Sequence, residues 1–452
     1  MIPRLQSFKL LAWLTVLVSL WLAALTSASV LAAPLTQANN CAEVYTVQAD
    51  DWLSKIADKF LGDALAYPAI FEATNQQHTA DLAFAQIANP DLIEIGWQLC
   101  IPTAEQAQAL LADPTGVSTS QNDLIVITDA LGREVTLASP PQRIVITGRA
   151  LFMIADAVYL FPGAAEKIVG IGDTGQGGFN FISLIDPHYA AKATLDRDAG
   201  AEQVAALRPD LVILKSFLAE TVGAPIEALG IPVVYLDLET PEQYARDLAI
   251  LGKVFQDEPR AQEVAAFYQS RVAQIEQTVS AAVNEPRVLM LYYNDRDGNV
   301  AFNVPPRNWI QTQMVEIAGG EPVWADANPG SGWAQVTLEQ IAAWDADQIF
   351  IIAYFNNPSV VVDGLKTDPN WQTLRAVKEG QLYAFPADLY SWDQPDPRWI
   401  LGLTWLAGRI HPEQFSDLDI IAEARAFYEL LYGLDAAFFV QNIQPTFQGD
   451  LP

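Results

Sequence analysis

From Leu124 onward, short apolar segments alternate with amphipathic ones, and no other pattern in the sequence limits the possible folds as strongly. The apolar segments have the length and composition of strands buried on both faces, which is typical of parallel sheets covered by helices. The predicted strands are Ile125–Thr128, Arg143–Ile146, Ile168–Ile171, Leu211–Leu214, Val233–Leu236, Val288–Tyr292, Gln348–Ala353 and Leu382–Phe385. The fold class is therefore predicted to be α/β.

An internal repeat divides this part of the chain into two related halves. The segment Ala201–Ile213 parallels Leu338–Phe350, because each reads as a short helix opening with Glu-Gln, then an aspartate and a buried strand. A repeat of this length between two α/β halves is better explained by matched lobes than by chance. Two lobes imply a cleft between them.

Residues 258–283, between the halves, have apolar side chains at three- and four-residue steps, so one face of a helix would be apolar throughout. A helix of about 25 residues spans about 38 Å, which is long enough to join two lobes as a single strut. An ordinary surface helix of either lobe is the alternative. We predict a first lobe over 124–257 and a second lobe over 284–445.

Residues 1–33 have the layout of a secretory signal. Arg4 and Lys9 precede an apolar run that ends in small residues. The run is also nearly long enough to remain as a membrane anchor, so cleavage and retention both stay open. In either case we expect the protein to work outside the cytoplasm, in the periplasm or at the cell wall.

The chain has 25 Lys plus Arg against 54 Asp plus Glu, a net charge of −29. Such an acidic surface repels phosphate backbones, so nucleic acid is not expected as a partner. The two cysteines, Cys41 and Cys100, bracket one compact segment. In an exported chain they are expected to pair, and a bridge closing a loop of this length contributes about 4 kcal/mol. Two unpaired buried thiols are the alternative.

Between the cysteines, the pattern predicts a strand, a helix, a second helix over about Tyr67–Asn75, and a closing strand. The segment opens with Tyr45-Thr46-Val47 and closes with Asn89-Pro90-Asp91-Leu92-Ile93 and then Gly96–Pro102. With these motifs, residues 41–102 resemble a lysin-motif (LysM) domain, although the loop Gln76–Ala88 is longer than usual. Residues 103–123 read as a short helix running into a linker.

The LysM resemblance implies binding of glycans that contain N-acetylglucosamine, peptidoglycan above all. The groove would lie near the two strand–helix junctions. A structural spacer without glycan affinity is the alternative. The residues that would line the groove are Asp50, Asp51, Trp52, Leu53, Asn89, Pro90 and Asp91.

A set of short motifs marks the remainder of the chain. They are Asp129-x-x-Gly132-Arg133, Val169–Gly172, Leu207–Val212, Leu229–Val233, Ala318–Gly320 and Trp333-x-Gln335-Val336-Thr337-x-Glu339. With them, the stretch 124–445 resembles a substrate-binding protein of the iron-complex and cobalamin class of ABC importers. The resemblance implies two Rossmann-like α/β lobes joined by one long helix, with a small βααβ LysM module in front. It also implies capture of a metal chelate (ferric siderophore, haem or cobalamin) and its delivery to a permease and its ATPase.

The resemblance also implies roles for individual residues. Glu202 and Glu339, one in each repeat, would dock onto arginines of the permease; the alternative is that each acid only favours its helix dipole. Arg398 is a further candidate for a ligand contact, and a structural role is the equal alternative. Flat apolar contact and pairing with acidic groups of a chelate would come from aromatic and arginine side chains at the cleft. The expected ligand contacts are Arg149, Phe179, Phe217, Arg307, Trp309, Trp333, Tyr354, Tyr390 and Trp392.

Other classes fit the sequence less well. Direct capture of bare Zn or Mn is disfavoured, because only His188 and His411 lie outside the front segment. An enzyme is disfavoured because residues 124–452 contain no cysteine, no HExxH and no GxSxG. We therefore expect no catalytic residue, no resident metal and no cofactor, in a monomer. A cell-wall-associated sensor that binds a ligand without transporting it remains the alternative.

Overall fold

The computed structural model describes residues 41–48, 51–87, 90, 92–112, 124–173, 180–282 and 284–451. The chain divides into two units, residues 1–120 and 121–452. The predicted secretory signal, residues 1–33, lies outside the described residues. Among the residues that are described, no helix has the length and the apolar character needed to cross a bilayer.

The front unit follows the predicted order of strand, two helices and strand. Its elements are β1 (Glu43–Thr46), α1 (Leu53–Leu61), α2 (Tyr67–Ala80), β2 (Gln98–Ile101) and a further helix, α3 (Ala104–Ala112). The two strands are antiparallel, and a disulfide joins Cys41 to Cys100. The helix predicted to end at Asn75 extends to Ala80. The prediction stopped early because Thr74 and Gln77 place polar side chains in the interior, so the apolar spacing of the helix is not visible in the sequence.

Among the described residues, the first lobe contains a parallel sheet with strand order β7-β6-β5-β8-β9. The strands are β5 (Ile144–Ile146), β6 (Ile168–Gly172), β7 (Ala193–Leu195), β8 (Leu211–Lys215) and β9 (Val233–Leu236). The helices are α4 (Leu151–Val158), α5 (Ala164–Lys167), α6 (Phe181–Ile185), α7 (Ala201–Ala205), α8 (Ala224–Glu227) and α9 (Pro241–Phe255). Segment Ile125–Thr128 is a strand as predicted, β3, but it pairs with β4 (Glu134–Leu137) in a separate hairpin.

The second lobe has a mixed sheet, which corrects the prediction of parallel strands throughout. Its order is β13-β11-β10-β14-β15; β10, β14 and β15 run parallel, whereas β11 and β13 are antiparallel, and β12 also pairs with β10. The strands are β10 (Arg287–Asn294), β11 (Ala301–Val304), β12 (Glu321–Pro322), β13 (Ala334–Val336), β14 (Gln348–Ala353) and β15 (Leu382–Ala384). The helices are α11 (Ile310–Ile317), α12 (Leu338–Trp344), α13 (Pro358–Thr367) and α14 (Arg375–Lys378).

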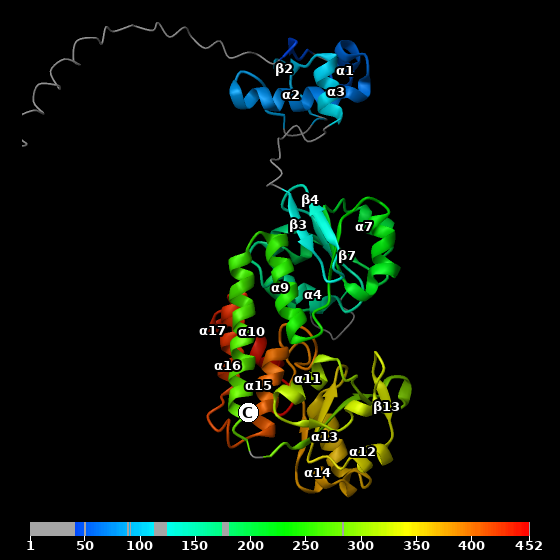
Figure 1. The fold of residues 1–452 in the computed structure, drawn as a ribbon, viewed down its shortest axis with the longest axis vertical. Coiled ribbons are helices and arrows are strands. Elements are labelled where there is room, and N and C mark those ends of the chain that lie inside the picture. The colour runs from blue at the N-terminus through cyan, green and yellow to red at the C-terminus, as the bar shows by residue number, and fades with distance from the viewer. Residues whose placement is uncertain are drawn as a thin grey trace, which may run out of the picture. The chain divides into compact units, whose positions relative to one another are not determined.

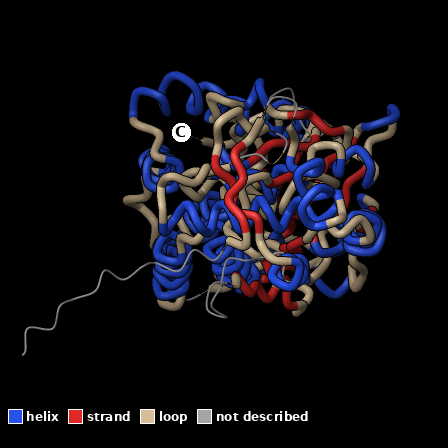
Figure 2. Tube along the Cα trace, turned by 90° about the horizontal axis from the view of Figure 1, so that it is seen from above, coloured by secondary structure: helices blue, strands red, loops and turns tan. Residues whose placement is uncertain are grey.

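One helix, α10 (Glu258–Val279), connects the two sheets and runs along both lobes (Figure 1). The carboxylate of Asp257 accepts a hydrogen bond from the backbone N–H of Arg260 (3.0 Å) and so caps its start. The helices α15 (Trp399–Ile410), α16 (Ile420–Tyr432) and α17 (Ala436–Phe438) follow the second sheet in the chain. Arg271 of α10 pairs with Glu423 of α16 at 3.2 Å. Strands alternate with helices in the sequence order of both lobes, and Figure 2 distinguishes the two by colour.

The internal repeat has a shared structural cause. In each lobe, the backbone N–H of an arginine that precedes or opens a central strand donates to the repeat aspartate: Arg143 to Asp210 (2.9 Å) and Arg287 to Asp347 (2.7 Å). Each guanidinium also donates to a backbone carbonyl at or just beyond the end of the repeat helix: Arg143 to Leu207 (2.6 Å) and Arg287 to Trp344 (2.9 Å). The repeat thus locks a helix onto a strand in both lobes.

Candidate ligand-binding cleft

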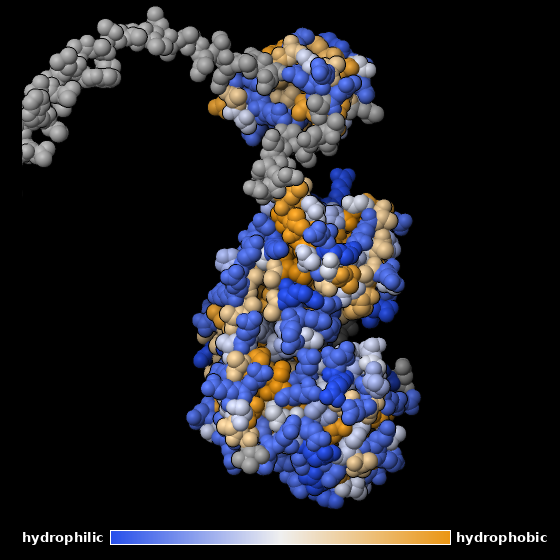
Figure 3. Space-filling model, viewed as in Figure 1, coloured by the Kyte–Doolittle hydropathy of each residue, from blue (hydrophilic) through white to orange (hydrophobic). Residues whose placement is uncertain are grey.

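A cavity of about 600 Å³ lies between the two lobes, within the size range of small-molecule sites. The surface is hollowed between the lobes on the side away from α10 (Figure 3). Ser216, Asp237 and Tyr354 directly follow strands β8, β9 and β14, as expected where the carboxyl ends of parallel strands meet a cleft. The lining residues are Ala150, Met153, Ser216, Phe217, Asp237 and Glu239 of the first lobe and Trp309, Gln311, Ser331, Trp333, Tyr354, Gln394 and Pro395 of the second.

Aromatic rings form the wall that the second lobe contributes. Trp333 stands edge-on to Trp309, with ring centroids 5.6 Å apart, and edge-on to Tyr354 at 6.2 Å. Tyr292, behind them on β10, lies 5.1 Å from Trp333 and 4.5 Å from Tyr354. Because these rings support one another, they present a stiff apolar surface to the cavity.

A buried carboxylate holds two of the cavity's polar side chains in place. Asp393 is fully buried, and it accepts hydrogen bonds from the Tyr354 hydroxyl (2.7 Å), the Gln311 amide nitrogen (3.1 Å) and the Ser391 hydroxyl (2.6 Å). Burial raises the pKa of Asp393 to about 6, although these three donors oppose the shift. Asp393 therefore lies in the interior and fixes the orientation of Tyr354 and Gln311, which line the cavity.

Acidic side chains form the facing wall of the first lobe. Asp237 and Glu239 follow β9, and each is paired from outside the cavity. Arg246 binds Asp237 at 2.6 Å, and Lys215, only 1% exposed, binds Glu239 at 2.5 Å and donates to the Asp237 carbonyl. Ser216 also donates to the Asp237 carboxylate. The carboxylates therefore line the cavity while their cations stand behind them.

The comparisons with known proteins agree with this architecture. A family model described as periplasmic binding protein matches residues 156–389, which is more than half of the chain. The chain belongs to the periplasmic binding protein family. In addition, a LysM domain model matches residues 45–102 of the front unit. The predicted family, fold and front module are thereby confirmed.

Curated relatives of this periplasmic binding protein bind different solutes. The molybdate-binding protein MolA of Haemophilus influenzae is 26% identical over 333 residues, covering 68% of this chain and 90% of that protein. The Fe(3+)-citrate-binding protein YfmC of Bacillus subtilis is 24% identical, covering 62% and 86%. A cobalamin-binding protein of Halobacterium salinarum is 26% identical, covering 53% and 58%. These relatives are binding proteins rather than enzymes.

Solved structures show the same fold. A periplasmic solute binding protein from Veillonella parvula superposes with a TM-score of 0.58 at 26% identity, covering 72% of this chain and 99% of that chain. Molybdate-bound MolA of H. influenzae superposes with a TM-score of 0.57 at 22% identity, covering 69% and 98%. The two-lobed architecture is therefore that of a solute-binding protein.

Four of the residues predicted as ligand contacts meet at the cavity of this binding protein: Phe217, Trp309, Trp333 and Tyr354. Phe217 is 59% exposed, and it also lines a second pocket of about 540 Å³ in the first lobe. Phe179 lies outside the described residues. Phe217 and the three rings of the second lobe thus face one another across the cleft.

Four other predicted contacts do not line the cavity. Arg149 lines the first-lobe pocket, 3.7 Å from Asp198, and Arg307 binds Asp326 at 2.8 Å. Tyr390 and Trp392 are buried in the interior. The Trp392 indole donates to Asp388 (3.0 Å), and Tyr390 stacks on Phe152 at 4.6 Å. The last two rings serve packing in this structure.

The prediction missed the polar lining of the cavity. Ser216, Asp237 and Glu239 directly follow two predicted strands, so the rule that ligands bind at strand ends could have found them. Gln311 and Gln394 carry no such signal, because one lies inside a helix and the other in a long loop.

Arg398 is structural and lies outside the cleft. It is fully buried, and its guanidinium binds Asp156 of α4 (2.6 Å), Asp388 (2.9 Å) and Asp396 (3.3 Å). Burial raises the pKa of Asp156 to about 6, against the attraction of Arg398. Because Asp156 belongs to the first lobe and the others follow the second sheet, this cluster ties the two lobes together.

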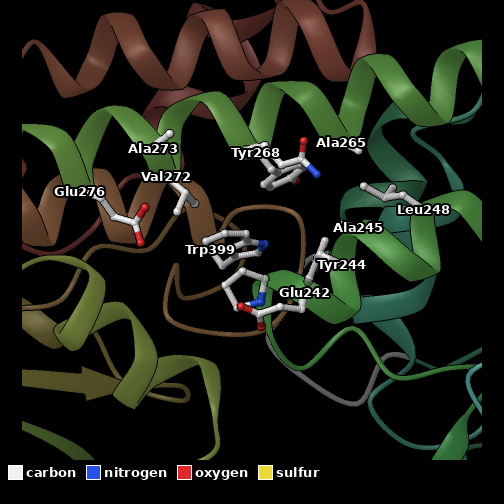
Figure 4. A pocket seen from close by; sticks show the side chains of 12 residues that line it. Glu242, Tyr244, Ala245, Leu248, Ala265, Tyr268, Val272, Ala273, Glu276 and Trp399 are labelled. Atoms are coloured by element: carbon white, nitrogen blue, oxygen red, sulfur yellow. The ribbon is translucent and has the colours of Figure 1, made fainter.

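An aromatic trio fastens the lobes to α10 at a second groove of about 410 Å³ (Figure 4). Tyr244 of α9, Tyr268 of α10 and Trp399 of α15 have ring centroids 5.3 to 5.7 Å apart. The Tyr268 hydroxyl donates to the Pro397 carbonyl at 2.7 Å. None of the predicted ligand contacts that the structure describes lines this groove. Its rings connect the strut to both lobes.

The repeat glutamates Glu202 and Glu339 lie in the first turns of α7 and α12, and both are exposed. The neighbouring repeat glutamines cap these helices, since Gln203 accepts from the Gly200 N–H and Gln340 from the Thr337 N–H, each at 2.9 Å. Both helices lie on the side of the lobes away from α10 (Figure 1). The glutamines therefore have a structural role. Glu202 and Glu339 lie exposed at the surface, and Glu339 is also hydrogen-bonded to the Thr337 hydroxyl and to its own backbone N–H, which lower its pKa.

The front unit exposes part of its predicted glycan groove. Trp52 is 56% exposed, whereas Leu53 is 2% exposed and anchors α1 in the core. Asp51 accepts hydrogen bonds from the Tyr45 hydroxyl (2.7 Å) and the Gln48 N–H (2.8 Å), which hold it against β1. Pro90 lies in a turn and is partly buried. The remaining predicted groove residues, Asp50, Asn89 and Asp91, lie outside the described residues.

Proposed function

We propose that this chain captures a metal chelate in the cleft between its lobes and delivers it to the permease of an ABC importer. The observation that carries the proposal is the cavity of about 600 Å³, walled by Trp309, Trp333 and Tyr354 on one lobe and by polar side chains on the other. Stiff aromatic rings suit the flat apolar surface of a corrin, a porphyrin or a siderophore backbone. Relatives that bind ferric citrate and cobalamin support this class of cargo.

Tryptophan fluorescence of the full chain tests ligand capture directly. We expect saturable quenching by at least one of ferric hydroxamate siderophores, haemin and cobalamin, and a loss of most of that quenching in Trp333→Ala. Trp344→Ala is the matched control, since Trp344 is a partly buried tryptophan of the same lobe that does not line the cavity. Equal loss in both variants, or no quenching by any chelate, would contradict the proposal.

Delivery to a permease is proposed to use Glu202 and Glu339. Their placement on corresponding helices of the two lobes suits docking onto two related permease subunits by charge pairing. Cells carrying Glu202→Arg with Glu339→Arg should lose chelate uptake, while the purified variant keeps the parent's affinity. Glu429→Arg, on the exposed face of α16, is the control and should transport normally. Normal uptake by the double variant would favour a sensor without a transport role.

Retention near the cell wall is proposed for the LysM module. Exposed aromatic rings stack on sugar rings, and Trp52 is available for such a contact. The full chain should sediment with purified peptidoglycan sacculi, and Trp52→Ala should reduce the bound fraction several-fold. Leu111→Ala, an exposed apolar residue of α3, should bind like the parent. Sedimentation that is unaffected by Trp52→Ala would remove Trp52 from the glycan groove.

A further inference from the structure

We propose that the cleft selects chelates that are uncharged or positively charged, and that it rejects oxyanions and carboxylate chelates. This inference rests on the proposed function, because it concerns the cargo of the same cavity. It is carried by the charge of the lining and by the aromatic wall.

The described lining of the cavity has no cationic side chain for an anion. Among the described residues that line the cavity, none is a lysine, arginine or histidine, and the charged ones are Asp237 and Glu239. The nearby cations are already paired: Lys215 is buried against Glu239, and Arg246 binds both Asp237 and Asp247. An anionic group placed here would meet two carboxylates without the charge-assisted hydrogen bonds by which arginine and lysine recognise oxyanions and carboxylates.

The predicted arginines do not change this balance. Arg149 is 61% exposed and lies 3.7 Å from Asp198 in the neighbouring first-lobe pocket. Arg307 is 62% exposed and binds Asp326 at 2.8 Å. In this structure both arginines are matched with acids outside the cavity lining.

The aromatic wall favours the same ligands. The ring faces of Trp309, Trp333 and Tyr354 carry partial negative charge, which attracts a cation. The same rings provide apolar contact area for a flat uncharged ligand. MolA, the molybdate-binding relative, carries the opposite kind of cargo. We therefore expect this chain to discriminate against the oxyanion that its relative binds.

The test uses chelates that differ only in charge. Ferrioxamine B, a cationic trihydroxamate, is compared with its N-acetyl form, which is uncharged, and its N-succinyl form, which carries a carboxylate. Cyanocobalamin is compared with its monocarboxylic acid, in which one amide is hydrolysed. Affinities of the full chain are measured by fluorescence and calorimetry, with molybdate and ferric citrate as further probes.

In whichever series binds, the carboxylate member should bind at least tenfold more weakly, and molybdate and ferric citrate should not bind. Asp237→Asn and Glu239→Gln should each reduce that discrimination at least threefold, whereas Glu242→Gln, just outside the cavity, should not. Anionic members that bind as well as their partners would overturn the selection and leave chelate capture intact. An absence of binding by every chelate would instead overturn the proposed function, and with it this inference.

Discussion

The two lobes meet at the cleft and again at the Arg398 cluster, and acidic and aromatic side chains gather at both. At the cluster, Asp156, Asp388 and Asp396 are sealed from water around one guanidinium. At the cleft, Asp237 and Glu239 keep a side facing a cavity while their cations lie behind them. The same residue types thus fasten the lobes in one place and leave a recognition surface in the other.

The largest expected effect comes from removing the cation of the cluster. Arg398→Met leaves three buried carboxylates without their partner, and breaking a buried pair in this way costs about 3–5 kcal/mol of unfolding free energy. Urea denaturation of the full chain measures it. Arg246→Met at the cleft is the counterpart and should cost less than Arg398→Met, since Arg246 is 40% exposed and its buried partner Asp247 keeps hydrogen bonds from two backbone N–H groups. Similar losses in both variants would erase the distinction between the two places.

The pH dependence of stability separates Asp393 from the exposed acids of the cleft. The pKa of Asp393 is about 6 in the folded state, above the ordinary aspartate value of about 3.8, so between these pH values the folded state holds a proton that the unfolded chain has released. Stability from this group is complete below about pH 4 and is lost as the pH rises through about 6. Asp393→Asn should reduce this fall by about 3 kcal/mol, while Asp156, whose pKa burial also raises to about 6, keeps its own share of it.

Thermal unfolding across the pH range checks this sign. Asp237→Asn is the control, since the Asp237 carboxylate pairs with Arg246, accepts a hydrogen bond from the Ser216 hydroxyl and is partly exposed. It should leave the fall between pH 4 and 6 unchanged. The prediction would be wrong if stability rose between pH 4 and 6 by the same amount in the parent protein and in Asp393→Asn. Ionisation of Asp393 would then cost the folded state no free energy.

A third comparison separates two tryptophans that the sequence placed in one group. Trp333→Ala should lower ligand affinity at least tenfold, about 1.4 kcal/mol, because Trp333 lines the cavity. Trp392→Phe should leave affinity unchanged and lower only stability, because its buried indole loses the hydrogen bond to Asp388. Titration and urea denaturation of both variants give the two readouts. An affinity loss in Trp392→Phe that matches Trp333→Ala would return Trp392 to the binding surface.

The α/β architecture and the connecting helix could be predicted because both leave patterns in the sequence, namely the spacing of apolar residues and the internal repeat. Helix α10 shows its apolar face in the sequence, and the pairs Arg143–Asp210 and Arg287–Asp347 explain why the two repeats share an aspartate at the same place. Strands β11 and β13 could not be predicted in the same way. They are short, partly exposed and antiparallel, so they lack the continuous apolar run that marks the buried strands.

The cleft was predictable only in part, because its aromatic side chains resemble those of the core in composition. Trp309 and Trp392 look alike in the sequence, yet Trp309 opens a helix at the cavity and Trp392 is enclosed by Asp388 and Phe447. Whether such a ring is exposed depends on the path of a loop, which no local pattern encodes. The polar residues Asp237 and Glu239 were more accessible to reasoning, since strand ends are a general position for ligand contacts.

The smallest expected effect concerns Arg149, the exposed counterpart of Arg398. Arg149 is 61% exposed and lies 3.7 Å from an aspartate that is itself 77% exposed, so this pair contributes about 0.5 kcal/mol or less to stability. Arg149→Gln should also leave the affinity for cationic and uncharged chelates within twofold, because the arginine lines the neighbouring pocket and not the cavity. Titration with ferrioxamine B and cyanocobalamin measures this. A tenfold loss of affinity would mean that Arg149 reaches the ligand when the lobes close. The cleft would then contain a cationic side chain, which would contradict the proposed selection against anionic chelates.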